Sequence, residues 1–291
     1  MWACQNARTF RDTKVKKALI IGCGYLGQRV APRLQELGLA VTGTTRSEKR
    51  AAELQEAGIP SAVFDLQTAA ENPLLEEKWD VAVYAAAPGK DGDAELVFRD
   101  APIACRHRLG DHLERFVHVS STGVYPQSSG EKLDEESPAD PGEGRSALIR
   151  EAERLLLKEQ AALVVRLGGL YGPGRSPLEW LRRPGFRERL RAGAAAWMNW
   201  IHIEDAAAAV SAAAAGGRTG EIYLAVDGCP VKRSDFYQLA AELAGVEPPE
   251  LDTDSADLGK QLSNRKLTEE LRVDLLYPDY RSGLEAISQS P

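Results

Sequence analysis

Short apolar segments alternate with longer amphipathic stretches through the first 170 residues of the chain. The apolar segments have the length of buried strands, and they cover residues 18–21, 40–43, 62–64, 81–85, 116–120 and 163–167. The amphipathic stretches have helical periodicity, and they cover residues 26–37, 48–57, 94–113 and 148–159. Because strands that alternate with helices form parallel sheets, the pattern predicts an α/β fold: a Rossmann-type, doubly wound parallel sheet with helices on both faces.

A glycine-rich segment joins the first expected strand to the first expected helix. Gly22, Gly24 and Gly27 fit the spacing G-x-G-x-x-G, and Tyr25 and Leu26 lie inside it. In this motif the first glycine allows a tight turn, the second lets a pyrophosphate approach the backbone, and the third lets helix and strand pack closely. The strand before it and the helix after it predict a dinucleotide-binding turn, with a glycine-rich turn that binds nothing as the alternative.

The regular alternation ends near residue 170, where glycines and prolines become frequent. Beyond it we expect an alanine-rich helix at residues 205–215, a strand at 222–226 and a helix at 234–244. We therefore expect an N-terminal extension over residues 1–14 and a dinucleotide-binding domain over 15–170, whose sheet the strand at 222–226 rejoins. Residues 171–220 and 228–291 are expected to form a smaller C-terminal substrate lobe.

The end of the second expected strand bears on the choice of cofactor. An acidic residue there binds the ribose 2′-hydroxyl of NAD, whereas an arginine accommodates the 2′-phosphate of NADP. Here Thr45, Arg46 and Ser47 follow the strand, and no carboxylate appears before Glu48. These side chains can donate hydrogen bonds and charge to a phosphate, so we expect NADP(H) in preference to NAD(H). The alternative is that Arg46 and Ser47 only begin the next helix.

Composition and charge exclude several classes of protein. The chain has 291 residues, 43% of them hydrophobic, and a formal net charge of −7, which argues against a nucleic-acid-binding surface. No apolar run is long enough to cross a bilayer, and the start of the chain lacks the apolar segment of a secretory signal. The four cysteines are scattered without metal-ligand spacing. We therefore expect a cytoplasmic protein that binds a small molecule, and no metal, nucleic acid or membrane.

Further segments at the ends of the expected strands carry a family resemblance. They are Asp65-Leu66, residues 84–87 (YAAA), 119–125 (VSSTGVY), 166–174 (RLGGLYGPG) and 199–205 (NWIHIED). Together with the glycine turn, these segments resemble the extended and atypical short-chain dehydrogenase/reductase superfamily. Within it, the chain is similar to NAD-dependent epimerase/dehydratase and nucleoside-diphosphate-sugar epimerase-like proteins. The resemblance covers nearly the whole chain. The resemblance implies that Asp65 and Leu66 contact the adenine and that Ala85, Ala86 and Ala87 line the cofactor site.

The resemblance also implies an active site, from which this sequence departs. In the family a serine or threonine orients the substrate, and a tyrosine exchanges a proton with it while a lysine one helical turn later lowers the tyrosine pKa. Ser121 fills the serine position, or Thr122 if the register shifts by one. The tyrosine position falls at Arg145 or Ser146 and the lysine position at Ile149 or Arg150, so the Tyr–Lys couple is absent.

Several residues are candidates to complete such a site. Tyr125 and His202 are candidate acids or bases beside Ser121, because they lie in the family's motifs, although packing roles are the alternative for both. Arg145, Arg150 and Tyr171, together with Thr122, are candidate substrate contacts, and the arginines suit an anionic substrate. The alternative for Arg150 is an ordinary solvated helix face.

Together these features predict an NADP(H)-dependent oxidoreductase, or a sugar-nucleotide epimerase or dehydratase, with a non-standard active site. The missing Tyr–Lys couple favours an alternative from another class, a non-catalytic NADP(H)-binding redox sensor or scaffold. Relatives of this kind pair through two helices, which here correspond to residues 94–113 and 148–159, so a homodimer is possible.

Overall fold

The computed structural model describes residues 15–89, 92–160, 162–190 and 192–289, so the expected extension over residues 1–14 lies outside the described residues. A seven-stranded sheet, entirely parallel, forms the centre, in the order β11-β7-β5-β4-β1-β2-β3. The strands are β1 (Lys17–Ile21), β2 (Ala40–Thr45), β3 (Ser61–Val63), β4 (Val81–Tyr84), β5 (Arg115–Ser121), β7 (Leu163–Leu167) and β11 (Ile222–Ala225). This architecture confirms the expected Rossmann-type fold, and β11 rejoins the sheet beside β7.

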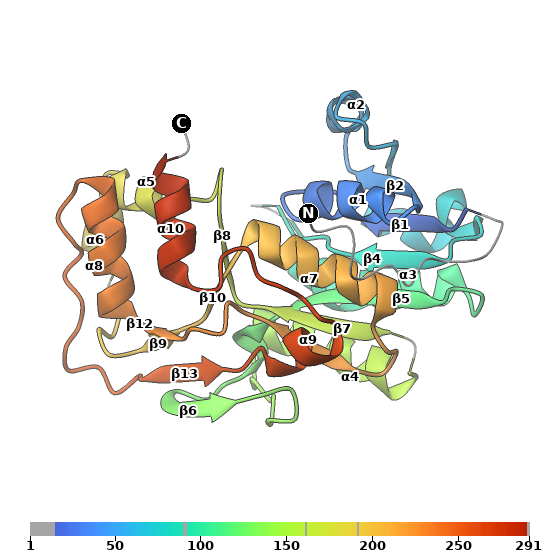
Figure 1. Ribbon diagram of the computed structural model, residues 1–291. Helices are drawn as coiled ribbons and strands as arrows, with labels where there is room; N and C mark the ends of the chain where they lie inside the picture. Colours follow the sequence, from blue (N-terminus) through green and yellow to red (C-terminus); the bar gives the residue numbers. More distant parts are fainter. Residues whose placement is uncertain (1–14, 90–91, 161, 191, 290–291) are drawn as a thin grey trace.

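One face of the sheet is covered by α1 (Gly27–Glu36), α2 (Glu48–Glu56) and α7 (Ile203–Gly216). Figure 1 shows α1 and α7 side by side, and the two helices are in contact. Ten of the fourteen residues of α7 are buried, and most of those are alanines, whose small side chains let the helix lie close to the sheet. This corrects the expected division of the chain, because α7 lies within residues 171–220 and yet covers the dinucleotide-binding sheet.

The opposite face is covered by η1 (Leu66–Glu71), η2 (Pro73–Glu76), a π-helical turn η3 (Leu96–Asp100), α3 (Ala101–Leu109) and α4 (Arg145–Lys158). The helix expected over residues 94–113 runs without a break from residue 94 to Leu109 and contains the π-helical turn η3. Pro102 lies directly after this turn, and Pro32 lies inside α1.

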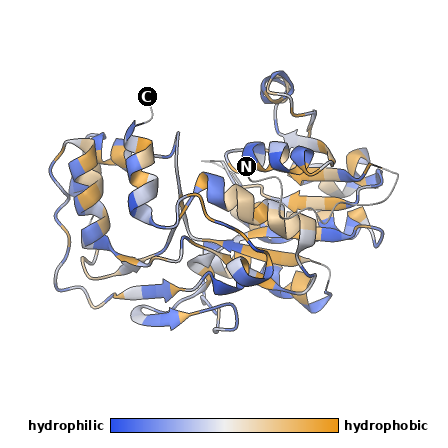
Figure 2. Cartoon of the chain, in the orientation of Figure 1, coloured by the Kyte–Doolittle hydropathy of each residue, from blue (hydrophilic) through white to orange (hydrophobic). Residues whose placement is uncertain are grey.

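A second lobe gathers the helices α5 (Pro177–Arg182), α6 (Phe186–Arg189), α8 (Arg233–Ala244) and α10 (Tyr280–Gln289) beside the sheet (Figure 1). Below them lies a four-stranded sheet of β12 (Val231–Lys232), β9 (Trp197–Met198), β13 (Gly259–Leu262) and β6 (Ser129–Leu133). A short pair, β8 (Gly169–Tyr171) and β10 (Trp200–His202), leads into the lobe, and α9 (Arg265–Glu270) packs on β11. Figure 2 shows β6 and β13 as largely hydrophilic, in contrast to the central strands.

The expected dimer helices α3 and α4 contribute to the core. Leu156 is buried against the sheet, whereas Leu155 and Leu157 on either side of it are half-buried. A homodimer through these helices stays a prediction. Among the described residues no helix is long and apolar enough to cross a membrane. Within the same ranges no group of three or more His, Cys, Asp or Glu side chains is placed to hold a metal ion.

Candidate cofactor and substrate clefts

A cleft of about 500 Å³ opens at the carboxyl ends of the central strands. Ligands of open α/β sheets bind at this edge, because the loops that leave the strands diverge there. Most of the predicted cofactor residues line it: Gly22, Gly24, Tyr25, Leu26, Thr45, Arg46, Leu66, Ala85, Ala86 and Ala87. Ser121 and Arg145 line it as well, so segments far apart in the sequence meet at one site.

The three glycines of the turn have different surroundings. Gly22 has φ +90°, and a Cβ there would lie 2.5 Å from the Cα of Ala86. A Cβ on Gly27 would lie 2.8 Å from the carbonyl oxygen of Gly22, so this glycine lets α1 approach the strand. A Cβ on Gly24 would meet nothing within 4 Å. The backbone at Gly24 is therefore open to the cleft, as a bound pyrophosphate requires.

The cleft is electropositive although the protein is acidic. Four arginines belong to its described lining, which contains no aspartate or glutamate. Arg46, Arg145 and Arg175 come from three separate segments, and none forms an ion pair with a described residue. Arg175 lies over the ring of Tyr25, and Arg145 lies over the ring of Phe98. Such a set of uncompensated cations favours an anionic ligand.

The residues after β2 divide between the cleft and the next helix. Thr45 and Arg46 line the cleft. Ser47 is not part of the described lining, because its hydroxyl accepts a hydrogen bond from the backbone N–H of Arg50 at 3.3 Å and caps α2. Arg50 itself reaches the cleft from the first turn of α2. Ser47 is thus placed for a structural role, and Arg50 takes its place in the lining.

Asp65 also differs from its expected role. Its carboxylate accepts a hydrogen bond from the backbone N–H of Gln67 at 3.0 Å and caps η1, and it lies outside the described lining of the cleft. Its neighbours Phe64 and Leu66 line the cleft instead. The wall after β3 is therefore apolar, as suits the face of a base.

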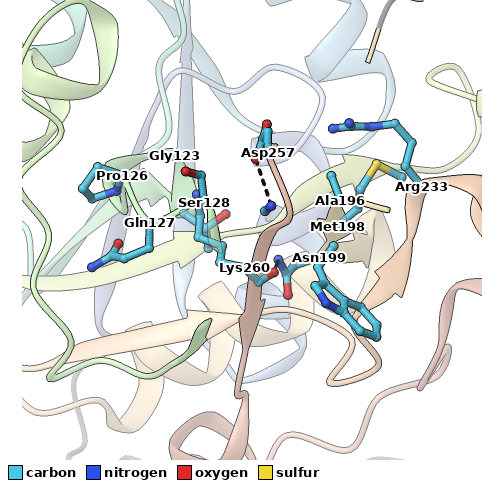
Figure 3. A pocket seen from close by; sticks show the side chains of 13 residues that line it. Gly123, Pro126, Gln127, Ser128, Ala196, Met198, Asn199, Arg233, Asp257 and Lys260 are labelled. Atoms are coloured by element: carbon cyan, nitrogen blue, oxygen red, sulfur yellow. Dashed lines mark hydrogen bonds between the residues drawn. The ribbon is translucent and has the colours of Figure 1, made fainter. Parts of the chain in front are cut away.

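Ser121 and Thr122 stand where two hollows meet. Ser121 lines the cleft, and its Oγ accepts a hydrogen bond from the N–H of Gly123 at 3.1 Å. Thr122 lines a second hollow of about 340 Å³ between the turn after β5 and the small sheet. Figure 3 shows this hollow, with Gln127 and Ser128 on one side and Met198 and Asn199 on the other. A Cβ on Gly123, which lines the second hollow, would lie 3.3 Å from the Oγ of Ser121, so this hydroxyl lies close to both hollows.

The first turn of α4 presents two side chains to the cleft. Arg145 and Ile149, one helical turn apart, line it, whereas Ser146 and Arg150 do not belong to the described lining. Of the two alignments that the sequence allowed for the family's Tyr–Lys couple, the one with Arg145 and Ile149 therefore fits this geometry. The start of α4 thus presents a cation and an apolar side chain to the cleft.

Tyr125 and Arg150 belong to a buried network and do not turn into the cleft. Arg166 donates to both carboxylate oxygens of Glu153 at 2.9 and 2.7 Å, and to the hydroxyl of Tyr125 at 2.6 Å. The Tyr125 hydroxyl donates to the carbonyl of Asp134, and Arg150 donates to the carbonyl of Ala139. Both side chains are thus committed to internal partners, which corrects their expected roles at the substrate.

The same network includes a fully buried carboxylate on α4. Glu153 is 0% exposed and Arg166 is 1% exposed. The hydroxyl of Ser120, which lines the cleft, donates to Glu153 at 2.5 Å. A buried ion pair thus lies directly behind the cleft wall.

Tyr171 and His202 are also structural. Tyr171 is fully buried, and its ring packs edge-on against His202 with 5.4 Å between ring centroids. The Nδ1 of His202 accepts from the backbone N–H of Glu204 at the start of α7, and burial lowers the pKa of His202 to about 4. Neither residue lines either hollow, so the expected acid–base role of His202 and substrate contact of Tyr171 are not supported by their positions.

Comparison with known proteins agrees with the geometry of the glycine turn. The family model of the NAD dependent epimerase/dehydratase family matches residues 18–225. This chain belongs to that family. The expected resemblance is therefore confirmed.

Proteins similar to this chain include Protein YeeZ of Escherichia coli (strain K12), 27% identical over 278 residues, which are 91% of this chain and 97% of that protein. A 4-hydroxy-2-methyl-3-oxo-4-farnesyl-3,4-dihydroquinoline-1-oxide ketoreductase of Stigmatella aurantiaca is 25% identical over 248 residues, or 78% of this chain and 72% of that protein.

Two solved structures share the fold. A putative NAD-dependent epimerase/dehydratase from Methylobacillus flagellatus is 30% identical, with a TM-score of 0.75 and coverage of 94% of this chain and 98% of that one. The dTDP-glucose 4,6-dehydratase of Bacillus anthracis, solved with NAD, is 18% identical, with a TM-score of 0.77 and coverage of 94% and 96%. This second likeness shows the fold alone.

The sequence did not point to several residues that line the cleft and the second hollow of this protein. Arg50 and Arg175 line the first cleft, and Arg233 and Lys260 line the second hollow. Arg175 follows the segment that resembles the family and could have been noticed there. Lys260 lies far beyond every motif, so no sequence signal pointed to it.

The buried ion pair behind the cleft generates a prediction about stability. Replacing Glu153 with alanine leaves Arg166 buried without its counter-charge, so we expect the free energy of unfolding to fall by about 3–5 kcal/mol. Urea unfolding measures the change. Glu151→Ala, on the exposed side of the same helix, is the control and should change stability by less than about 0.5 kcal/mol. A loss no larger than that of the control would contradict the role given to Glu153.

His118 generates a prediction about pH. Its side chain lines the deep end of the cleft, is 3% exposed, and has no partner for either ring nitrogen within the described residues. Burial lowers its pKa to about 4, against the opposing charge of Glu153. In the unfolded chain the imidazole of His118 becomes protonated near pH 6.5, whereas in the folded protein it stays neutral down to about pH 4. The protein is therefore most stable, with respect to His118, above pH 6.5, and it loses stability as the pH decreases from 6.5 towards 4.

We therefore expect His118→Phe to flatten the pH dependence of stability over this range, by up to about 3 kcal/mol at the acidic end. Urea unfolding at pH 7 and pH 5 measures the difference. The exposed His112→Gln is the control, and it should follow the pH dependence of the unaltered protein. Parallel curves for His118→Phe and the unaltered protein would refute the assignment.

Proposed function

We propose that the protein is an NADP(H)-dependent oxidoreductase that acts on a carbonyl or hydroxyl group of a small polar substrate, carbohydrate-like or nucleotide-linked. The observation that carries the proposal is a cleft in which an open glycine turn meets uncompensated arginines. A reductase among the similar proteins, the Stigmatella aurantiaca ketoreductase, supports an oxidoreductase reading.

The residues of the cleft fit a dinucleotide with a 2′-phosphate. Gly24 leaves room at the N-terminus of α1 for the pyrophosphate, and the apolar Leu66 would lie against the adenine. Arg46 and Thr45 stand at the end of β2, where the 2′-phosphate of NADP would be held. The absence of a carboxylate from the described lining supports NADP(H) over NAD(H), because a carboxylate would repel the phosphate.

The residues near Ser121 would provide the substrate end of the reaction. NADP(H), when bound, would supply or accept a hydride at this end of the cleft. Ser121, held in the cleft by the turn that its own Oγ caps, would donate a hydrogen bond to the substrate oxygen and polarise it. Arg145, without a carboxylate partner among the described residues, would attract an anionic group of the substrate to the same corner.

A second candidate function is a non-catalytic NADP(H)-binding redox sensor. The observation that favours it is the presence of Arg145 and Ile149 at the positions of the Tyr–Lys couple. Both candidates require the cofactor to bind, and they differ in turnover.

The cofactor assignment is tested by titrating the protein with NADPH and NADH while following reduced-nicotinamide fluorescence. We expect NADPH to bind more tightly than NADH. Arg46→Ala should weaken NADPH binding by about tenfold to a hundredfold, because a charged hydrogen bond to phosphate is lost, and should leave NADH binding unchanged.

Lys49→Ala is the matched control, since Lys49 is exposed on α2 and outside the described lining of the cleft. Equal weakening of NADPH binding by both variants would show that only general charge matters. Failure of both nucleotides to bind would overturn the oxidoreductase and the sensor together.

The role of Ser121 separates the enzyme from the sensor. Ser121→Ala removes the hydroxyl that would polarise the substrate oxygen, so we expect turnover of carbonyl compounds with NADPH to fall by about a hundredfold or more while NADPH affinity is kept. Steady-state kinetics and the fluorescence titration give the two readouts. A protein that binds NADPH fully and reduces no carbonyl compound would be the sensor.

A further inference from the structure

The second hollow is built from three segments that are distant in the sequence. Residues 126–128 form one wall, residues 196–199 the other, and β13 crosses between them (Figure 3). Gly259, with φ +61°, lies so close to Trp197 that a Cβ would be 2.4 Å from the Trp197 carbonyl oxygen. The side chain of Asn199 bonds the Lys260 carbonyl at 2.9 Å and the Leu262 N–H at 2.8 Å. The backbone on both sides of Lys260 is thereby fixed.

Lys260 occupies the middle of this hollow. Its Nζ donates to the carbonyl oxygen of Tyr125 at 2.6 Å, and the N–H of Tyr125 in turn bonds the Thr122 carbonyl. The ammonium group therefore lies at the end of the turn that Ser121 begins. Burial lowers the pKa of Lys260, against the opposing charges of Asp257 and Glu131, and the cation Arg233 shares the hollow.

The titratable groups of the cleft are poor sources of a proton. The Cys23 thiol is buried, with its pKa raised to about 11. The Tyr84 hydroxyl donates to the Val97 carbonyl, and burial raises its pKa well above the ordinary value. The Tyr25 hydroxyl is buried, with a raised pKa, and His118 has a pKa of about 4 and carries no additional proton at neutral pH. The arginines keep their protons.

Few side chains of the second hollow can serve as a proton donor. The Arg233 guanidinium group donates to the Gly193 carbonyl at 3.0 Å, and a guanidinium is a poor proton donor in catalysis. The Asp257 carboxylate accepts the N–H of Gly259 at 2.9 Å. Lys260 is therefore the group of the described lining that can both carry a proton at neutral pH and release it.

We propose that Lys260 is the general acid of this site, in place of the tyrosine that the family pattern leads one to expect on α4. The proposal rests on the proposed function. In carbonyl reduction Lys260 gives one proton to the carbonyl oxygen, which Ser121 polarises, while the carbonyl carbon accepts a hydride from reduced nicotinamide. An alcohol and oxidised nicotinamide result, and the neutral amine regains a proton from water.

The test measures NADPH-dependent reduction of 4-nitrobenzaldehyde, an activated carbonyl probe, by the full-length protein and three variants. Lys260→Met should lower kcat by about a hundredfold or more, because a general acid contributes that much. Lys260→Arg keeps the positive charge but cannot release the proton, so it should be equally slow. Lys232→Met is the control: Lys232 lies over the outer Trp197 ring and outside the described lining, and its loss should leave kcat unchanged.

The pH profile and cofactor binding complete the test. The kcat of the unaltered protein should fall as the pH rises through the pKa of Lys260, below the ordinary lysine range, and this fall should disappear in Lys260→Met. The fluorescence titration should give the same NADPH affinity for every variant. Full activity of Lys260→Arg, or an unchanged pH profile in Lys260→Met, would overturn the assignment of Lys260. If the unaltered protein binds NADPH but does not reduce the probe, the proposed oxidoreductase fails as well.

Discussion

The close approach of Gly22 to Ala86 is the constraint on which the rest of the site depends. The glycine backbone lies so near the end of β4 that a methyl group has no room, and the adjacent Gly27 brings α1 against the same turn. This contact sets the first loop against the loop after β4 and leaves Gly24 open to the space between them. The cleft and its orientation towards Ser121 follow from that arrangement.

Behind the cleft, a buried polar network connects the central sheet to the second lobe. Ser120 faces the cleft and bonds Glu153, Glu153 bonds Arg166, and Arg166 bonds Tyr125. The carbonyl of Tyr125 then receives the ammonium group of Lys260. Because buried polar groups tolerate few alternative geometries, this chain of bonds fixes the turn after β5 relative to β13. The two hollows therefore have a defined relation at Ser121 and Thr122.

Charge is distributed unevenly over the molecule. The chain as a whole is acidic, whereas Arg46, Arg145 and Arg175 face the cleft and form no ion pair with a described residue. An acidic exterior around a cationic cleft draws anions to one place.

The sequence by itself determined the central fold and the glycine turn, because both depend on local signals: apolar strand segments, amphipathic helices and glycines at fixed spacing. It could not determine that α7 returns to cover the sheet, that Tyr125 and His202 are tied to internal partners, or that Ser47 and Asp65 cap helices. Only the tertiary structure brings Lys260 beside the turn after β5, since 135 residues separate Lys260 from Tyr125 and their contact depends on how the small sheet packs.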